Sequence, residues 1–349
     1  MSETKARLVD TTTRSRRWNP IREIFSRASI NDSEARQRRR APRELTAFVL
    51  AGGGSRGAVQ VGMLSELVAR GIRADRVYGA SVGAVNAAAY CGDPTPEGIE
   101  NLENVWRNLR GDEVFPKSRL AGPWIFFQQR ESVHANSGLR KLIEDGLKFE
   151  NMEDSPIPFE VVATSLTDGK ERSIAHGPAL EALLASTAIP AILPPVRIGD
   201  ELLIDGGVVN NVPISHALDV GATRIYVLLC GPLNYQPPTA KRPIEAIMTA
   251  FFVAVHARFV RELAAVPPNV AVTVFSGGGE PSGTYRDFSS TPELIVQGRA
   301  EAARVLDAAG ASIGTRSPDA GSPDAGSSDS GSLGVESRSA TGEFGMATP

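Results

Sequence analysis

Cysteine is scarce in this chain of 349 residues: Cys91 and Cys230 are the only two, and they lie far apart in apolar surroundings. A disulfide framework and a zinc site built from cysteine both need more thiols at closer spacing, so the sequence argues against both. We expect two buried free thiols.

Long hydrophobic runs are also missing. The longest candidate, "AIMTAFFVAV" from Ala246, is about half the length that a membrane-spanning helix needs. No apolar core of a signal peptide follows the first basic residues. We therefore expect a cytoplasmic protein.

The net charge of -3 is small, but it is unevenly distributed. Residues 1–44 hold twelve Lys and Arg against six Asp and Glu, whereas residues 313–349 hold two Arg against five acids. The region between them is acidic, which argues against nucleic-acid binding by a folded core. The tail contains the near-repeat "SPDAGSPDAGSSDSGS", a composition that cannot bury enough surface to fold. We expect disordered flanks, 1–44 and 313–349, around one domain at 45–312.

The basic flank contains one patterned stretch, "NPIREIFSRA", in which Asn19 and Pro20 have the residue types of a helix cap and first turn. Trp18, Ile21 and Phe25 have roughly helical spacing among arginines. One interpretation is a short amphipathic helix in peripheral contact with an anionic membrane. A solvated arm is the interpretation we prefer, because the apolar face is so short.

Strand and helix patterns alternate through the central region, which predicts an α/β fold with a mostly parallel sheet covered on both faces. Expected strands are "LTAFVLA", "RVYGA", "PFEVVATSL", "ELLID", "TRIYVLLC" and "NVAVTVFS". Expected helices are "AVQVGMLSELVARG", "VGAVNAAAY" and others around Leu102, Leu139, Leu183, Ala217, Val255 and Ala302.

The first strand runs into "AGGGSRGAVQ", where Gly52, Gly54 and Gly57 fit G-x-G-x-x-G. A dinucleotide site is one interpretation, but it needs an acid at the end of the second strand, and Asp75 precedes that strand. A phosphate-binding P-loop is excluded because no Lys-Ser or Lys-Thr follows Gly57.

Ser81 stands at the end of the second strand, between Gly79 and Gly83 in a G-x-S-x-G pattern. The two strands thus bring unhindered backbone N–H groups and a serine on a sharp turn to one edge of the sheet. Acyl transfer needs this pair, a nucleophilic oxygen and fixed donors for the charge that develops on the carbonyl oxygen. A plain strand-to-helix turn is the structural alternative for the two glycines.

A serine nucleophile needs a base, and the chain has four histidines. His134 lies in a segment we interpret as loop and helix start, and His176, which follows a short strand, is the best placed for a loop role. His216 and His256 lie within expected helices, where a residue on the helix face is the more common role.

Asp205 fits better as the base, because it ends the apolar strand "ELLID" and is followed by Gly206 and Gly207. We expect this strand to bring Asp205 to the same edge as Ser81. An aspartate is a weak base near pKa 4, so the role requires a desolvated pocket and direct contact with the hydroxyl. A turn aspartate that bonds its own backbone is the alternative.

Together these motifs resemble the patatin-like phospholipase family, from about Thr46 to Ala222 and more loosely to about Ala309. "GGGSRG" looks like the family's oxyanion loop, "GASVG" its nucleophile elbow and "DGG" its second catalytic motif, while "ALLASTAIPAILPPV" looks like a further family segment. The resemblance implies a three-layer α/β/α sandwich, no metal and no cofactor.

By that resemblance Ser81 is the nucleophile, Asp205 is the base, and backbone N–H groups within Gly52, Gly53, Gly54, Ser55, Arg56 and Gly57 form the oxyanion hole. Those near Gly53, Gly54 and Ser55 hold the oxyanion, while Arg56 fixes the loop or meets an anionic head group. The aromatic stretch from Pro123 to Phe127 either lines an acyl groove or packs on the core.

The resemblance implies a serine lipid acyl hydrolase of phospholipase A or lysophospholipase type, with a lipid or ester as its substrate. A carboxylesterase on more soluble esters is the alternative within enzymes. A non-catalytic lipid-binding or regulatory protein on the same fold, and a dinucleotide-binding oxidoreductase, are the alternatives of other classes.

Overall fold

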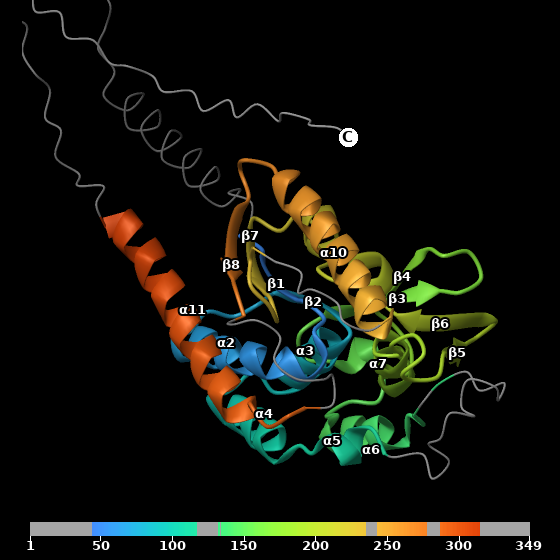
Figure 1. Cartoon of the computed structure of the whole chain (residues 1–349). Coiled ribbons are helices and arrows are strands. Elements are labelled where there is room, and N and C mark those ends of the chain that lie inside the picture. The colour runs from blue at the N-terminus through green and yellow to red at the C-terminus, as the bar shows by residue number, and fades with distance from the viewer. Residues whose placement is uncertain (1–43, 117–131, 133, 235–242, 278–286, 315–349) are drawn as a thin grey trace, which may run out of the picture. The chain divides into compact units, whose positions relative to one another are not determined.

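The computed structural model describes residues 44–116, 132, 134–234, 243–277 and 287–314 (Figure 1). The patterned stretch around Pro20, the aromatic segment 123–127 and the tail beyond residue 314 lie outside these residues. What the sequence predicts for them stays a prediction.

An eight-stranded sheet with the order β5-β6-β3-β2-β1-β7-β8 forms the centre, and β4 pairs with β3 beside this path. Strands β3, β2, β1, β7 and β8 are parallel to one another, β4 and β6 pair antiparallel with β3, and β5 pairs antiparallel with β6. The strands are β1 Thr46–Leu50, β2 Arg76–Ala80, β3 Phe159–Ser165, β4 Glu171–Ile174, β5 Val196–Ile198, β6 Glu201–Asp205, β7 Arg224–Leu228 and β8 Ala271–Phe275. The mostly parallel sheet is as predicted.

Alternation along the strands divides the core between the two faces of the sheet. Phe48 and Leu50 of β1 pack into one cluster with residues of α2, α3, α4, α7 and α11, whereas Ala47 and Val49 pack into a second with residues of α9 and α10. The helices are η1 Gly54–Gly57, α2 Ala58–Ala69, α3 Val82–Gly92, α4 Pro96–Asn108, α5 Gly111–Val114, α6 Ser137–Gly146, η3 Met152–Asp154, α7 Ala179–Ser186, α8 Gly207–Asn210, α9 Ile214–Asp219, α10 Pro243–Ala264 and α11 Thr291–Gly314. The three-layer α/β/α arrangement is confirmed.

Strand β6 differs from the sequence expectation in its direction. It runs antiparallel to β3, with Asp205 opposite Ala163, whereas Ala80 at the end of β2 pairs with Val162. Asp205 therefore comes level with Ser81 because β3 extends beyond β2 and β6 runs back along it. The aspartate's place is as expected, but the parallel path that led to that expectation is wrong.

The edge of the sheet at the amino ends of β1 and β2 tests the dinucleotide interpretation. Asp75 lies at the amino ends of β1 and β2, where its carboxylate accepts a hydrogen bond of 2.9 Å from the backbone N–H of Thr46. It is thus remote from the glycine loop, which follows the carboxyl end of β1. This position contradicts the acid placement of a dinucleotide site.

Within the described ranges, no helix has the length and apolar character to cross a membrane. The same ranges contain no cluster of His, Cys, Asp and Glu arranged to hold a metal ion. Cys91 and Cys230 are buried and unpaired with each other, as expected.

Candidate active site

Ser81 occupies a strained turn between β2 and α3, with φ 54° and ψ -130°. A side chain at either neighbouring glycine would block this turn: a Cβ on Gly83 would lie 2.2 Å from the carbonyl oxygen of Leu50, and one on Gly79 would lie 2.7 Å from the backbone of Ala84. The two glycines of the motif are therefore required by close backbone packing. Non-glycine residues at positive φ are uncommon and concentrate at functional sites.

The hydroxyl of Ser81 donates a hydrogen bond of 2.6 Å to Oδ2 of Asp205. The other carboxylate oxygen, Oδ1, accepts from the backbone N–H of Gly207 at 2.7 Å. Ser81 is 6% exposed and Asp205 is 4% exposed, so the pair is shielded from bulk water. The structure thus brings together the two residues that the sequence proposed as nucleophile and base.

A segment before β6 ties the serine to the aspartate, and its contacts were not anticipated. The hydroxyl of Ser186 accepts from the N–H of Ser81 at 3.1 Å and donates to the carbonyl oxygen of Val162 at 2.6 Å. Two residues on, the carbonyl oxygen of Ala188 accepts from the N–H of Asp205 at 2.9 Å. The "ALLASTAIPAILPPV" motif therefore connects the two turns on which the pair depends.

Burial raises the pKa of Asp205 to about 6, against hydrogen bonds from Ser81 and Gly207 that lower it. A carboxylate with this pKa is a better proton acceptor than an exposed one, yet it is still mostly ionised at neutral pH.

We predict that kcat/KM for ester hydrolysis falls on the acid side with an apparent pKa near 6, because protonated Asp205 cannot accept the serine proton. The rate should decrease about tenfold for each pH unit well below that value and level off about one unit above it. A soluble ester assayed from pH 4 to 8 measures this. A limb near pH 4 would show that the reacting carboxylate is not desolvated.

The glycine loop lies against the serine turn. A Cβ on Gly52 would lie 2.9 Å from Cβ of Ser81 and 2.3 Å from Oδ1 of Asn211, so only glycine fits there. The backbone of Asn211 holds this residue, since its carbonyl oxygen accepts from the N–H of Gly52 at 3.2 Å. Gly54 has φ +59°, in the left-handed region that favours glycine.

Two N–H groups of the loop donate to backbone carbonyl oxygens, that of Gly52 to Asn211 and that of Arg56 to Gly53. The guanidinium of Arg56 lies near Gly231, where an added Cβ would meet it at 3.2 Å. This position favours a role for Arg56 in fixing the loop over one in meeting a head group.

The histidines have other surroundings. Nδ1 of His134 lies 3.0 Å from the carbonyl oxygen of Pro116, and His176 is exposed beside the amino ends of β2 and β3. Both ring nitrogens of His216 contact carboxylates, Nδ1 that of Glu160 and Nε2 that of Glu171. Burial lowers the pKa of His216, but these bonds outweigh it and raise the value to about 10. His216 is thus a cation that two carboxylates hold in place. The hydroxyl of Ser81 donates instead to Asp205.

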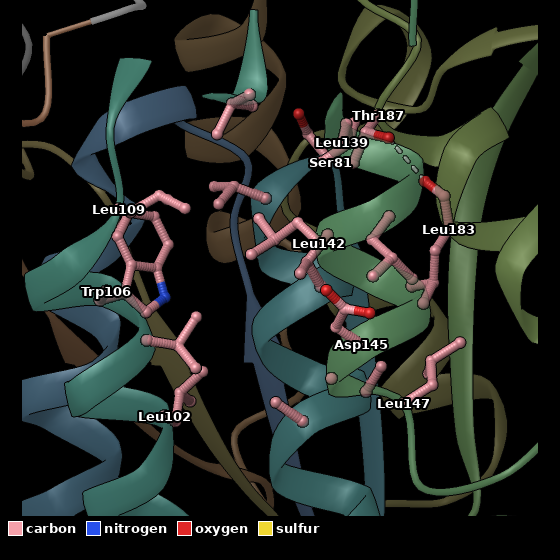
Figure 2. A pocket seen from close by; sticks show the side chains of 18 of the residues that line it. Ser81, Leu102, Trp106, Leu109, Leu139, Leu142, Asp145, Leu147, Leu183 and Thr187 are labelled. Carbon is pink, nitrogen blue, oxygen red and sulfur yellow. Dashed lines mark hydrogen bonds between the residues drawn. The ribbon is translucent and has the colours of Figure 1, made fainter. Parts of the chain in front are cut away.

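A cavity of about 300 Å³ opens beside Ser81, between helices α3, α4, α6 and α7. Figure 2 shows Ser81 and Thr187 toward one end, Trp106 and Leu102 along one wall, and Leu142 and Leu183 facing them. Asp145 and Leu147 lie away from Ser81. Sequence periodicity marks these leucines as core residues, and it contains no signal that they enclose a space.

The fold and the site define an α/β protein that carries a serine and carboxylate pair, a glycine loop and an apolar cavity at one edge of a mostly parallel sheet. Residues 48–218 match the model of the family described as patatin-like phospholipase. These residues thus form a patatin-like phospholipase domain.

Curated relatives match part of the chain at low identity. An uncharacterized NTE family protein of Mycobacterium tuberculosis is 27% identical over 56% of this chain and 32% of its own length. The neuropathy target esterase sws of Drosophila melanogaster is 27% identical over 60% of this chain and 15% of its own. Patatin-like phospholipase domain-containing protein 7 of Rattus norvegicus is 28% identical over 53% and 13%. The chain therefore spans a third or less of the length of these relatives.

Solved structures also resemble the chain. VipD from Legionella pneumophila is 16% identical, with a TM-score of 0.41 and coverage of 77% of this chain and 67% of that one. Human GIVD cytosolic phospholipase A2 is 12% identical, with a TM-score of 0.41 and coverage of 78% and 60%.

Proposed function

We propose that this protein is a serine lipid acyl hydrolase of phospholipase A or lysophospholipase type. The observation that carries the proposal is the 2.6 Å hydrogen bond from the hydroxyl of Ser81 to Asp205 at one end of an apolar cavity. A nucleophile, its base and an apolar site for the substrate then share one place. The names of two relatives, an esterase and a phospholipase domain-containing protein, agree with this chemistry.

In the first half of the reaction, Oγ of Ser81 attacks the ester carbonyl carbon while Asp205 accepts its proton. The negative charge on the carbonyl oxygen is met by backbone N–H groups of Gly53, Gly54 and Ser55, since that of Gly52 is engaged by Asn211. Asp205 then returns the proton to the departing alcohol, which leaves an acyl-serine. The amino end of α3, which begins one residue after Ser81, adds a positive electrostatic potential that stabilises the negative charge on the carbonyl oxygen.

In the second half, water replaces the alcohol. Asp205 accepts a proton from the water as it attacks the acyl carbon, and Ser81 recovers its proton when the fatty acid leaves. These steps need no group beyond the residues named and water.

The cavity favours one acyl chain as its occupant. Its volume of about 300 Å³ is at the lower end of ligand pockets, roughly 300–1,000 Å³. A dry apolar cavity of about half this volume holds one benzene molecule. We therefore place a single acyl chain between Trp106 and Leu183, with the head group outside.

We predict that Leu142→Trp shortens the accepted chain, because the indole would fill space in the cavity that Leu142 lines (Figure 2). The rate on a dodecanoyl p-nitrophenyl ester should fall at least tenfold, and the rate on the acetyl ester should stay within about threefold. Val296→Trp on the exposed face of α11 is the matched control and should change neither. Equal losses on both esters would show that the acyl chain does not bind in this cavity.

A non-catalytic lipid-binding protein on the same fold is distinguished by one experiment. Such a protein would bind fatty acid in the cavity but would neither hydrolyse esters nor react with a fluorophosphonate probe. Peripheral contact of the basic segment before residue 44 with anionic membranes, the interpretation we prefer less than a solvated arm, concerns residues outside the described ranges.

A further inference from the structure

A chain of three buried polar side chains runs beneath the glycine loop, on helices α2, α3 and α4. Nε1 of Trp106 donates to Oδ1 of Asn86 at 2.9 Å, and Nδ2 of Asn86 donates to Oε1 of Gln60 at 2.9 Å. Gln60 and Asn86 are 0% exposed and Trp106 is 5% exposed. None of the three side chains takes part in the proposed proton transfers, although the ring of Trp106 lines the cavity proposed for the acyl chain.

This network of side chains ends on backbone carbonyl oxygens on both sides of the glycine loop. Nε2 of Gln60 donates to Ala51 at 2.7 Å, just before the loop, and to Leu228 at 2.9 Å on β7. Nδ2 of Asn86 also donates to Gly57 at 3.0 Å, where the loop ends. The loop from Gly52 to Gly57 is therefore held at both ends by the same pair of amides.

Each polar side-chain atom of Gln60, Asn86 and Trp106 has a partner, which makes the network sensitive to substitution. A donor or acceptor that loses its partner in a buried site cannot turn to water and must move or stay unsatisfied. The strands nearby need no amide for their own pairing, because β1 and β7 form a regular parallel ladder. The amides therefore hold the backbone specifically where the ladder stops and the glycine loop begins.

Trp106 connects this network to the cavity. Its ring forms part of the cavity wall, and an added Cβ on Gly57 would lie 3.1 Å from it (Figure 2). The indole therefore touches the space proposed for the acyl chain, the end of the glycine loop and, through Nε1, Asn86.

We propose that Asn86, held between Trp106 and Gln60, is a positioning residue that fixes the oxyanion loop relative to Ser81. This inference rests on the proposed function, because the network is proposed to hold in place the N–H groups that meet the charge developing on the carbonyl oxygen. A misplacement of those groups by about 1 Å costs roughly a hundredfold in rate.

The test compares Asn86→Leu, Gln60→Met and Trp106→Phe in the full chain, with the acetyl p-nitrophenyl ester as substrate. Because an acetyl group is too short to fill the cavity, damage to the cavity wall alone leaves this substrate unaffected. We expect kcat to fall about 10- to 100-fold with KM within about threefold, and the largest loss at Asn86→Leu. The double variant Trp106→Phe with Asn86→Leu should be no slower than Asn86→Leu, because the indole acts through the amide.

Tyr90→Phe is the matched control on the same helix. Its hydroxyl is fully buried and accepts a hydrogen bond from the N–H of Ala74, so its loss also removes a buried bond, but one remote from the loop. It should lower the thermal midpoint and leave kcat near the wild-type value. If kcat of Tyr90→Phe falls as far as that of Asn86→Leu, the role of the network is only structural.

The remaining outcomes separate this inference from the function on which it rests. A wild-type protein without ester hydrolysis or fluorophosphonate labelling overturns the proposed function and this inference with it. An active wild type with folded variants within about twofold in kcat overturns the positioning role alone. Should Asn86→Leu not fold, Trp106→Phe decides, because it removes the N–H donor and keeps an aromatic ring in the cavity wall; the acetyl ester does not depend on the part of the wall that is lost, so normal kcat there rejects the proposal.

Discussion

Replacement of Ser81 by alanine is expected to abolish both ester hydrolysis and labelling by a fluorophosphonate probe. The hydroxyl that donates to Asp205 is the only atom of this residue that can form the acyl bond, and alanine removes it. Loss of the nucleophile in a well-studied serine protease lowers kcat by roughly a millionfold. We expect a fall of at least about ten thousandfold, to the limit of detection.

The matched control for this variant is Ser65→Ala. Ser65 lies on α2, where its hydroxyl accepts a hydrogen bond of 2.7 Å from Arg299 at the protein surface. Its substitution should leave labelling and hydrolysis unchanged. Labelling that persists in Ser81→Ala and disappears in another serine variant would move the nucleophile elsewhere.

The two turns of the site could be predicted from the sequence because they depend on glycine. Gly52, Gly79 and Gly83 allow backbone approaches that any side chain would block, and such requirements leave a local pattern. The parallel strands around them are short apolar runs, which sequence patterns also identify well.

The antiparallel edge of the sheet was not predicted, although a local signal existed. "VRI" and "ELLI" flank Gly199 and Asp200, and Gly199 has φ +59°, as a two-residue hairpin turn requires. This hairpin sends β6 back along β3 and brings Asp205 level with Ser81. Pairing of β6 with β3 depends on residues about forty positions apart, which no local pattern specifies.

The supporting polar contacts are the least predictable part of the site. Ser186, Asn86 and Gln60 lie within helices, where their spacing is that of ordinary core positions. Their roles come from partners distant in sequence, such as the carbonyl oxygens of Val162 and Leu228. A buried amide among mostly small and apolar helix residues is the hint for Asn86 and Gln60, since such a group needs a partner when buried.

Substitution of Asp205 by asparagine tests the base separately from the nucleophile. The amide has almost the same shape, and its oxygen can still accept from the N–H of Gly207, so the turn should persist. It cannot accept the proton of Ser81, however, and general-base catalysis is worth about 10²- to 10⁴-fold. We expect kcat to fall by about a thousandfold or more, with slower fluorophosphonate labelling and no acid limb near pH 6 in the residual rate.

Variants of the histidines complete this experiment, because they separate a serine and aspartate pair from a triad. His216 is held by Glu160 and Glu171, and His176 lies exposed at the amino ends of β2 and β3, away from the turn that carries Ser81. Alanine at His176, His216 or His256 should leave hydrolysis within a few fold. A thousandfold loss at one of them, together with a mild effect of Asp205→Asn, would make that histidine the base. A thousandfold loss at Asp205 alone leaves the carboxylate as the group that accepts the proton, in the desolvated pocket that raises its pKa.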